Sequence, residues 1–262
     1  MEFTDQLHRK IEIPKHSRRV ISLVPSQTEL LFDLGLEENI AGITKFCVHP
    51  EGLRKRKKVV GGTKTVHIEK IRALEPDLIL CNKEENTKEM VSELEKLAPV
   101  HVSDIVSLED AFKLMQQYGQ IFGKRSPVKD MISEIQEKKK KVEAKTLKTA
   151  TKRVAYFIWK DPLMVAGKET FINELLKLNR FENVFTGRYP ETNLEELQNL
   201  NLDLILLSSE PFPFKAKHKE IFENIDAEVI LVDGEFFSWY GSRLTKAMDY
   251  FLRLQDHASI SR

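Results

Sequence analysis

Short apolar runs alternate with stretches of helical periodicity along the first part of the chain. Residues 20–24 form a mostly apolar run that predicts a buried strand, and residues 26–34 predict a helix with Ser26 as its N-cap and Gly35 just past its end. Further elements follow: strands at residues 40–44, 78–81 and 100–102, and helices at residues 68–74 and 87–97. This alternation is typical of a mostly parallel sheet with helices on both faces.

Two longer helices are predicted in the middle of the chain. Residues 107–122 place apolar side chains on one stripe and end at Gly123. Ser126 and Pro127 then supply an N-cap and an N1 proline for a helix that reaches about Lys145. About 20 residues of helix span about 30 Å, which is the length of a small domain. We therefore expect this helix to join two lobes rigidly.

An internal repeat indicates that the two lobes share a topology. Residues 68–80 align with residues 194–206, and six of the thirteen aligned positions are identical. The sequence therefore predicts an α/β fold of two Rossmann-like lobes with parallel sheets joined by one long backbone helix. The expected N-terminal α/β lobe, inter-lobe helix and C-terminal α/β lobe are residues 1–125, 126–148 and 149–262.

Composition excludes several classes of protein. The 262 residues carry 41 Lys and Arg against 40 Asp and Glu, so the basic excess of a nucleic-acid-binding protein is missing. No apolar run approaches the roughly 20 residues that span a bilayer. The two cysteines, Cys47 and Cys81, are too few for a disulfide framework. The first residues lack the apolar segment of a signal peptide, so a cytoplasmic location stays open.

Candidate ligand contacts follow the predicted strands. In open α/β sheets ligands bind beyond the carboxyl ends of the strands, so the loops of two facing lobes are expected to line one cleft. The candidates in the first lobe are Phe46, Cys47, His49, Thr63, Lys64, Asn82 and Lys83. The candidates in the second lobe are Trp159, Lys160, Arg188, Phe236, Trp239 and Tyr240.

Aromatic side chains are concentrated in these loops. Loops usually run over the surface, so Trp159 and Trp239 are interpreted as contacts for a flat or apolar ligand, with packing between loop and sheet as the alternative. For Phe212, Phe214 and Phe237 the two interpretations are equally good.

Two short patterns leave their chemistry open. Cys47 and His49 stand two residues apart, a spacing that suits a soft-metal ligand pair, and the alternative is a packed thiol beside a solvent-exposed histidine. The segment from Gly61 to Lys64 could cradle an anion through its backbone N–H groups, but it lacks the spacing of a phosphate-binding loop, and a plain turn fits equally well.

Four ordered motifs resemble a known family. Residues 19–30 (RVISLVPSQTEL), residues 68–80, residues 165–170 (VAGKET) and residues 182–185 (ENVF) are similar to motifs of the helical-backbone, or class III, periplasmic solute-binding proteins that serve cobalamin and ferric-siderophore ABC importers. The resemblance implies a monomeric, extracytoplasmic receptor, without a catalytic role or a required cofactor, that captures a corrinoid or ferric-siderophore chelate. Its implied partners are an ABC permease and ATPase. In the family a glutamate in each lobe docks onto permease arginines, and the matching residues are Glu69 and Glu195. The alternative is that these are two solvated carboxylates near helix N-termini.

Two other functions remain as alternatives. The chain could bind free metal or haem without a permease, or it could be an enzyme that uses Cys47 with His49 or His67 as its base. None of the common hydrolase, metalloprotease or nucleotide-binding fingerprints supports an enzyme. The basic loop residues favour an anionic ligand such as a ferric chelate, and they are Lys45, Lys64, Lys83, Lys160 and Arg188.

Overall fold

The chain divides into two compact units. The computed structural model describes residues 1–15 and 17–260, with side chains to Gln255, so residues 261 and 262 of the predicted C-terminal lobe lie outside the described residues. Unit 1 is Met1–Glu134 with Tyr240–Arg243, and unit 2 is Ile135–Trp239 with Leu244–Arg262. The chain thus contributes one short late segment to unit 1, which the sequence pattern did not predict. The three-part division at residues 125 and 149 stays a prediction.

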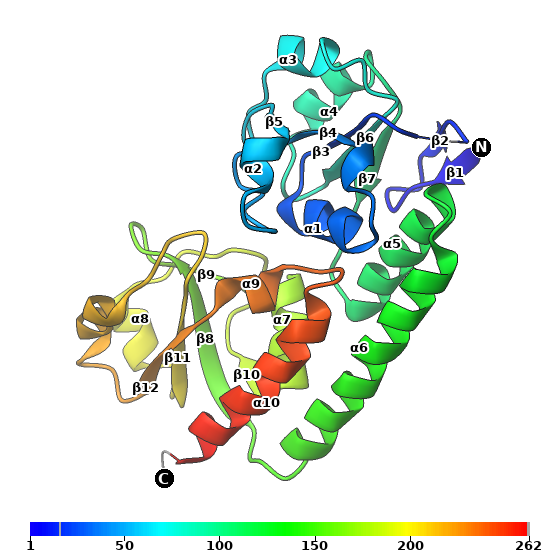
Figure 1. The fold of residues 1–262 in the computed structure, drawn as a ribbon. Helices are drawn as coiled ribbons and strands as arrows, with labels where there is room; N and C mark the ends of the chain where they lie inside the picture. The colour runs from blue at the N-terminus through cyan, green and yellow to red at the C-terminus, as the bar shows by residue number, and fades with distance from the viewer. Residues whose placement is uncertain (16, 261–262) are drawn as a thin grey trace. The chain divides into compact units, whose positions relative to one another are not determined.

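Unit 1 is built on a five-stranded parallel sheet (Figure 1). The strand order is β5-β4-β3-β6-β7, which places β3 at the centre with β4 and β6 on either side. The strands are β3 (Val20–Ser22), β4 (Ile40–Ile43), β5 (Lys58–Val59), β6 (Leu78–Asn82) and β7 (Val100–Ser103). β3, β6 and β7 are buried along their whole length, as expected for strands covered on both faces.

Four short helices connect these strands, and the longer α5 follows the last of them. The unit also holds a β1–β2 hairpin and the 3₁₀ turn η1 (Glu37–Asn39); the hairpin strands are Glu2–Thr4 and Lys10–Glu12. The helices are α1 (Pro25–Asp33), α2 (Leu53–Arg56), α3 (Ile68–Arg72), α4 (Lys88–Leu94) and α5 (Leu108–Ile121). The prediction of Ser26 as an N-cap is wrong, because α1 begins at Pro25, whose fixed φ suits the first helical position.

The long helix α6 spans Arg125–Thr146. It begins one residue before the predicted cap, so Ser126 and Pro127 lie inside its first turn, where a proline needs no N–H partner. Gly123 separates α5 from α6 with a φ of 68°, a left-handed conformation that glycine adopts without a steric penalty. The unit boundary falls within α6, between Glu134 and Ile135.

Unit 2 repeats the parallel arrangement. Its sheet has the strand order β10-β8-β11-β12, and the short β9 pairs antiparallel with β8. The strands are β8 (Lys152–Trp159), β9 (Met164–Val165), β10 (Phe181–Asn183), β11 (Leu204–Ser208) and β12 (Glu228–Val232). Phe157 of β8 aligns with Leu207 of β11, and both are fully buried in the core. The loops that follow β8 and β11 therefore leave the same edge of the sheet.

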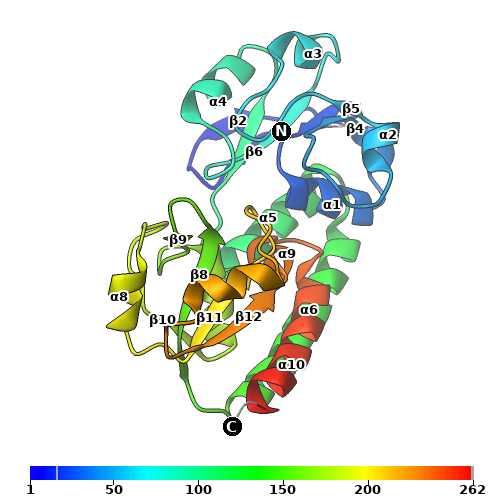
Figure 2. The same cartoon turned by 90° about the vertical axis from the view of Figure 1, so that its left-hand side faces the viewer.

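Helices cover the sheet of unit 2 as well. They are α7 (Phe171–Leu178), α8 (Leu194–Gln198), the 3₁₀ helix η2 (Ala216–Phe222), α9 (Gly234–Ser238) and α10 (Leu244–Ile260). α10 lies beside the later part of α6 in both views (Figure 2). There Lys138 Nζ lies 2.7 Å from Asp249 Oδ2, and Lys145 Nζ donates to the Leu252 carbonyl at 2.7 Å.

The fold class predicted from the sequence is confirmed: each unit is α/β with a parallel sheet, and the long helix α6 runs from one unit into the other. Within the described part of the chain, no helix combines the length and the apolar character that crossing a membrane requires.

Candidate functional site

The loop after β4 presents one exposed aromatic ring. Phe46 is 49% exposed, and Lys45 Nζ lies 5.0 Å from the centroid of its ring. A cation over an aromatic face is attracted by the ring quadrupole, so the pair forms a basic, aromatic surface at the carboxyl end of the sheet. Phe46 is therefore placed where a ligand can reach it.

Cys47, in the same loop, is part of the interior. The residue is fully buried, and its Sγ lies 3.2 Å from Thr28 Oγ1 and 3.3 Å from Thr44 Oγ1. Burial raises the pKa of the Cys47 thiol, which keeps it protonated and a poor nucleophile or metal ligand. Two residues on, His49 is half-buried. No group of three or more His, Cys, Asp and Glu side chains suited to a metal ion occurs among residues 1–15 and 17–255.

The loop after β6 is a turn organised by two asparagines. Asn82 Oδ1 accepts from the backbone N–H groups of Glu84 and Glu85 at 2.8 and 3.2 Å, while Asn86 Oδ1 accepts from the Asn82 N–H at 2.8 Å. Asn82 is almost fully buried, so its amide shapes the loop rather than facing solvent. Lys83 is exposed and forms an ion pair with Asp104 at 2.6 Å.

A second loop lies against this turn. Asn86 Nδ2 donates to the Thr63 carbonyl at 2.8 Å, and Lys64 Nζ donates to the Glu84 carbonyl. The structure thus brings Thr63, Lys64, Asn82 and Lys83 together through these two contacts, although β4 and β3 lie between β5 and β6 in the sheet. Glu85 joins them: burial raises the pKa of its carboxyl, and Lys64 opposes that shift. Its position in the Asn82–Asn86 loop was the only sequence signal for it.

Gln27 is the centre of a buried polar network in unit 1. Its Nε2 donates to Ser103 Oγ at 2.7 Å and to the Tyr240 hydroxyl at 3.1 Å, and its Oε1 accepts from the Tyr118 hydroxyl at 2.7 Å. Burial raises the pKa of the Tyr240 phenol well above its usual range. Tyr240 was predicted to contact ligand. The structure instead places it in the interior of unit 1, because Gln27 and Ser103 hold its hydroxyl.

A buried ion pair lies close to this network. Arg243 Nε and Nη2 donate to the two oxygens of Glu29, each at 2.7 Å, and both side chains are only 6% exposed. Together with the Gln27–Tyr240 bond, this bidentate pair anchors the segment Tyr240–Arg243 to α1. The buried motif PSQTE at residues 25–29 therefore helps to hold unit 1 together.

Aromatic side chains gather at the carboxyl ends of β8 and β11 in unit 2. Trp159 ends β8, is 41% exposed and meets Phe212 edge-to-face, with ring centroids 5.9 Å apart. Its indole N–H donates to the Asp161 carbonyl at 3.1 Å, which fixes the ring. Lys160 is half-buried and lies 3.1 Å from the Asp161 carboxylate. Trp159 keeps an open face that a ligand can use.

Trp239 has a different role from Trp159. It is 7% exposed, and its indole N–H donates to Glu210 Oε1 at 3.0 Å, an oxygen that also accepts from the Ser238 hydroxyl at 2.5 Å. Phe236 is half-buried and stacks on Tyr250 at 4.9 Å. The side chain of Trp239 is thus committed to packing within unit 2. The sequence did not decide between ligand contact and packing for three phenylalanines. Of these, Phe214 and Phe237 are buried and Phe212 is half-buried.

The motif at residues 165–170 is a backbone scaffold for the loop of Arg188. Gly167 N–H donates to the Arg188 carbonyl at 2.8 Å, and Glu169 N–H donates to the Gly187 carbonyl at 3.0 Å. A Cβ on Gly167 would lie 2.4 Å from the Gly187 carbonyl oxygen, so only glycine permits this approach. Asn183 extends the scaffold by donating to the Ala166 carbonyl at 2.8 Å. Arg188 itself is half-buried.

The two glutamates of the repeated motif are both exposed. Glu69 lies in the first turn of α3 and Glu195 in the first turn of α8. Glu69 is paired with Arg72 on its own helix at 3.3 Å. Each carboxylate is therefore available on the surface of its unit.

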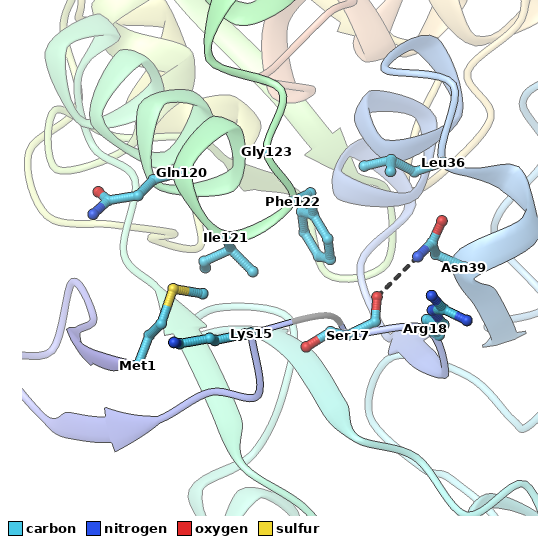
Figure 3. A pocket seen from close by; sticks show the side chains of 10 residues that line it. All are labelled: Met1, Lys15, Ser17, Arg18, Leu36, Asn39, Gln120, Ile121, Phe122 and Gly123. Atoms are coloured by element: carbon cyan, nitrogen blue, oxygen red, sulfur yellow. Dashed lines mark hydrogen bonds between the residues drawn. The ribbon is translucent and has the colours of Figure 1, made fainter.

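A cavity of about 270 Å³ in unit 1 lies at the edge of the sheet formed by the amino ends of its strands (Figure 3). Arg18 precedes β3 and Asn39 precedes β4, so the cavity adjoins the amino ends of two parallel strands. Asn39 Nδ2 donates to the Ser17 carbonyl at 2.8 Å and closes one side of it. Ligands of open α/β sheets bind at the opposite, carboxyl edge.

Two sequence relatives match most of the chain. The chain is 26% identical over 260 residues to an uncharacterized ABC transporter substrate-binding lipoprotein, YvrC, of Bacillus subtilis, covering 94% of this chain and 82% of that protein. It is 25% identical over 241 residues to the vitamin B12-binding protein of Pectobacterium atrosepticum, covering 88% and 85%.

Solved structures share the fold. The petrobactin-binding protein YclQ of Bacillus subtilis superposes with a TM-score of 0.81 at 18% identity, covering 98% of this chain and 97% of that one. The apo periplasmic haem-binding protein RhuT of Roseiflexus superposes with a TM-score of 0.79 at 17% identity, covering 92% and 99%. At such identities the likeness shows the fold alone.

A family model spans most of the chain. The model described as periplasmic binding protein matches residues 20–236, from the first strand of the unit 1 sheet to α9 of unit 2. All four motifs that carried the resemblance in the sequence lie within that span, apart from Arg19 at its edge. The chain belongs to the periplasmic binding protein family.

Proposed function

We propose that the chain is the substrate-binding component of an ABC importer and that it captures a metal chelate, a corrinoid or a ferric siderophore. The observation that carries the proposal is the open face of Trp159, which is fixed by its own hydrogen bond at the carboxyl end of β8. An ordered, exposed aromatic ring at this edge is suited to a ligand with a flat face. The B12-binding relative and the receptor relative support this interpretation.

The burial of potentially reactive side chains supports a binding function rather than a catalytic one. The proposed nucleophile of an enzyme, Cys47, is enclosed by two threonine hydroxyls and has a raised pKa. The other polar side chains in the interior of unit 1, such as Gln27 and Glu29, are held by hydrogen bonds to neighbouring residues. Groups committed in this way hold the fold in shape and are not free to react.

The ligand contacts that we propose are the exposed and half-buried members of the predicted set. Cys47, Asn82, Trp239 and Tyr240 are buried, so we assign them supporting roles. The remaining proposed contacts are Phe46, His49, Thr63, Lys64, Lys83, Trp159, Lys160, Arg188 and Phe236.

Binding of haem or free metal without a permease is the competing function. A panel of ligands separates the candidates: cyanocobalamin, cobinamide, haemin, ferric siderophores and divalent metal ions, each followed by thermal unfolding. A ligand at 100 times its Kd adds about 2.7 kcal/mol to stability, which raises the midpoint measurably. A shift from a corrinoid or a ferric siderophore supports the proposal, a shift from haemin alone favours the competing haem function, and a shift from free metal ions alone contradicts the proposal.

For partners, we propose an ABC permease and ATPase, engaged by Glu69 and Glu195 outside the cytoplasm, with the receptor acting as a monomer. Exposed charges contribute only about 0.2–1 kcal/mol each, so their task is to set orientation on the permease. Reversing both charges should abolish stimulation of the reconstituted ATPase and leave ligand affinity unchanged. Reversal of Glu196, an exposed neighbour on the same helix, is the matched control. Full stimulation by the doubly reversed receptor would contradict the docking role.

A further inference from the structure

Four rings form an aromatic corner in unit 2, defined as Trp159, Phe212, Phe214 and His218. Phe212 is its centre: its ring centroid lies 5.9 Å from Trp159, 4.8 Å from Phe214 and 5.4 Å from His218. Phe212 N–H donates to the Ile158 carbonyl at 3.2 Å, which ties the loop after β11 to the end of β8. The corner is therefore an ordered surface at the carboxyl edge of the sheet. Phe214 is buried beneath it, while Trp159 remains open.

Three lysines lie close to His218 at this corner. Lys160, Lys215 and Lys217 all lie near enough to His218 that their charges lower the pKa of its ring, after the larger effect of desolvation. Lys160 is paired with Asp161 at 3.1 Å. In the part of the chain that the structure describes, the exposed Lys215 and Lys217 form no ion pair. Their positive charges are therefore not neutralised by the protein beside an apolar, aromatic face.

The tautomer of His218 is set by its backbone contact. Lys215 N–H donates to His218 Nδ1 at 2.9 Å, so that nitrogen carries the lone pair and the ring proton is on Nε2. In this state Nε2 is a hydrogen-bond donor and has no lone pair for a metal. His218 thus adds a neutral N–H donor to the three ammonium groups.

We propose that the aromatic corner and its lysines recognise an anionic aromatic chelate, with the ring against Trp159 and Phe212 and the carboxylates or phenolates facing Lys215, Lys217 and His218 Nε2–H. This inference rests on the receptor role in the proposed function. Of its two ligand classes it favours the ferric siderophore, as a catecholate, over the corrinoid, and it also admits haem, the ligand of the competing function. A planar tetrapyrrole with carboxylates and a ferric catecholate share this chemistry. A neutral corrinoid presents no anionic group to the lysines, so they add less to its binding affinity.

The test measures affinity for three probes: haemin, a ferric tris-catecholate and neutral cyanocobalamin. The variant Lys215→Gln/Lys217→Gln removes the two unpaired charges, and Lys219→Gln, an exposed lysine on the same 3₁₀ helix, is the matched control. We expect an anionic probe to bind at least 10-fold more tightly than cyanocobalamin. The double variant should weaken that probe by about 3- to 20-fold, the range available from two exposed charge pairs. Cyanocobalamin binding to the double variant, and binding to the control, should change less than 2-fold.

The outcomes separate the inference from the proposed function. Tight binding of cyanocobalamin that is indifferent to Lys215 and Lys217 overturns the inference and leaves the receptor function standing. Failure of all three probes to bind overturns the inference, and the proposed function falls with it only if the rest of the ligand panel also fails to bind. If haemin is the ligand, His218→Asn should leave the Soret band of the bound haem in place, since His218 does not coordinate iron. A displaced Soret band would overturn the assigned donor role. If only haemin binds, the recognised anions are the carboxylates of a tetrapyrrole; if only the ferric catecholate binds, they are phenolates.

Discussion

The buried pair of Glu29 and Arg243 makes a sharp prediction about the stability of unit 1. Replacing Arg243 with Met leaves a carboxylate that is 6% exposed without its bidentate partner. Removing one member of a buried pair usually costs about 3–5 kcal/mol, because the remaining charge stays desolvated. We expect a loss of that size for Arg243→Met and a similar one for Glu29→Met.

The double variant Glu29→Met/Arg243→Met should recover most of this loss. Two apolar side chains of similar length remove both desolvation penalties, and such replacements are often neutral or even stabilising. The two single losses would sum to about 6–10 kcal/mol if they were independent, so the coupling energy should be several kcal/mol. The same variants test whether α1 anchors the Tyr240–Arg243 segment to unit 1.

Urea unfolding monitored by far-UV circular dichroism measures these energies. Fluorescence is unsuitable on its own, because Trp159 and Trp239 both belong to unit 2. With a urea dependence of about 2–3 kcal/mol per M, the single variants should lower the midpoint by about 1–2 M. A single-variant loss below about 1 kcal/mol, or a double-variant loss equal to the sum of the singles, would refute a tightly coupled buried pair.

Three further predictions address the site and the core. Trp159→Ala should weaken binding of the chelate by about 1–3 kcal/mol in a titration. Trp239→Ala should mainly lower the thermal midpoint, because the Trp239 side chain is buried and bonded to Glu210. Equal affinity losses in the two variants would contradict this distinction. Burial lowers the pKa of His101, so the imidazole takes up a proton when the protein unfolds, and stability should fall as the pH drops below about 6.5. Urea midpoints measured between about pH 7.5 and 5.5 should show this dependence, and it should be smaller in His101→Gln. The thiol of Cys47 should resist alkylation, counted by mass spectrometry, until urea unfolds the protein, because it is fully buried with a raised pKa.

The order of strands and helices was readable from the sequence because it depends on local periodicity. The strand at residues 78–81 and the helix at 87–97 appear as β6 and α4, with Thr87 accepting from Met90 N–H as an N-cap. Helix starts were less predictable. Ser26 and Ser126 both resemble caps, yet each lies one residue inside its helix. Several polar residues in sequence satisfy the same pattern, and small differences in local packing decide among them.

Burial of the candidate site residues depends on contacts far apart in sequence. Trp159 and Trp239 both follow predicted strands, but only Trp239 meets a carboxylate, Glu210, which comes from another loop. Tyr240 joins unit 1 because its hydroxyl meets Gln27, a residue 213 positions away. His218 was not singled out from the sequence. Its phenylalanine and lysine neighbours at residues 212–217 are local, and the fold adds Lys160 from another loop.

Titration calorimetry of the purified chain tests the central claim most directly. The chain should be titrated with whichever chelate of the panel produces the largest thermal shift. The account predicts one ligand per chain, with a Kd of about 1 µM or below, equivalent to about −8 kcal/mol, and a loss of affinity in Trp159→Ala. The absence of saturable binding by any chelate of the panel, or saturation by free metal ions alone, would contradict the assignment of this chain as a chelate-binding receptor.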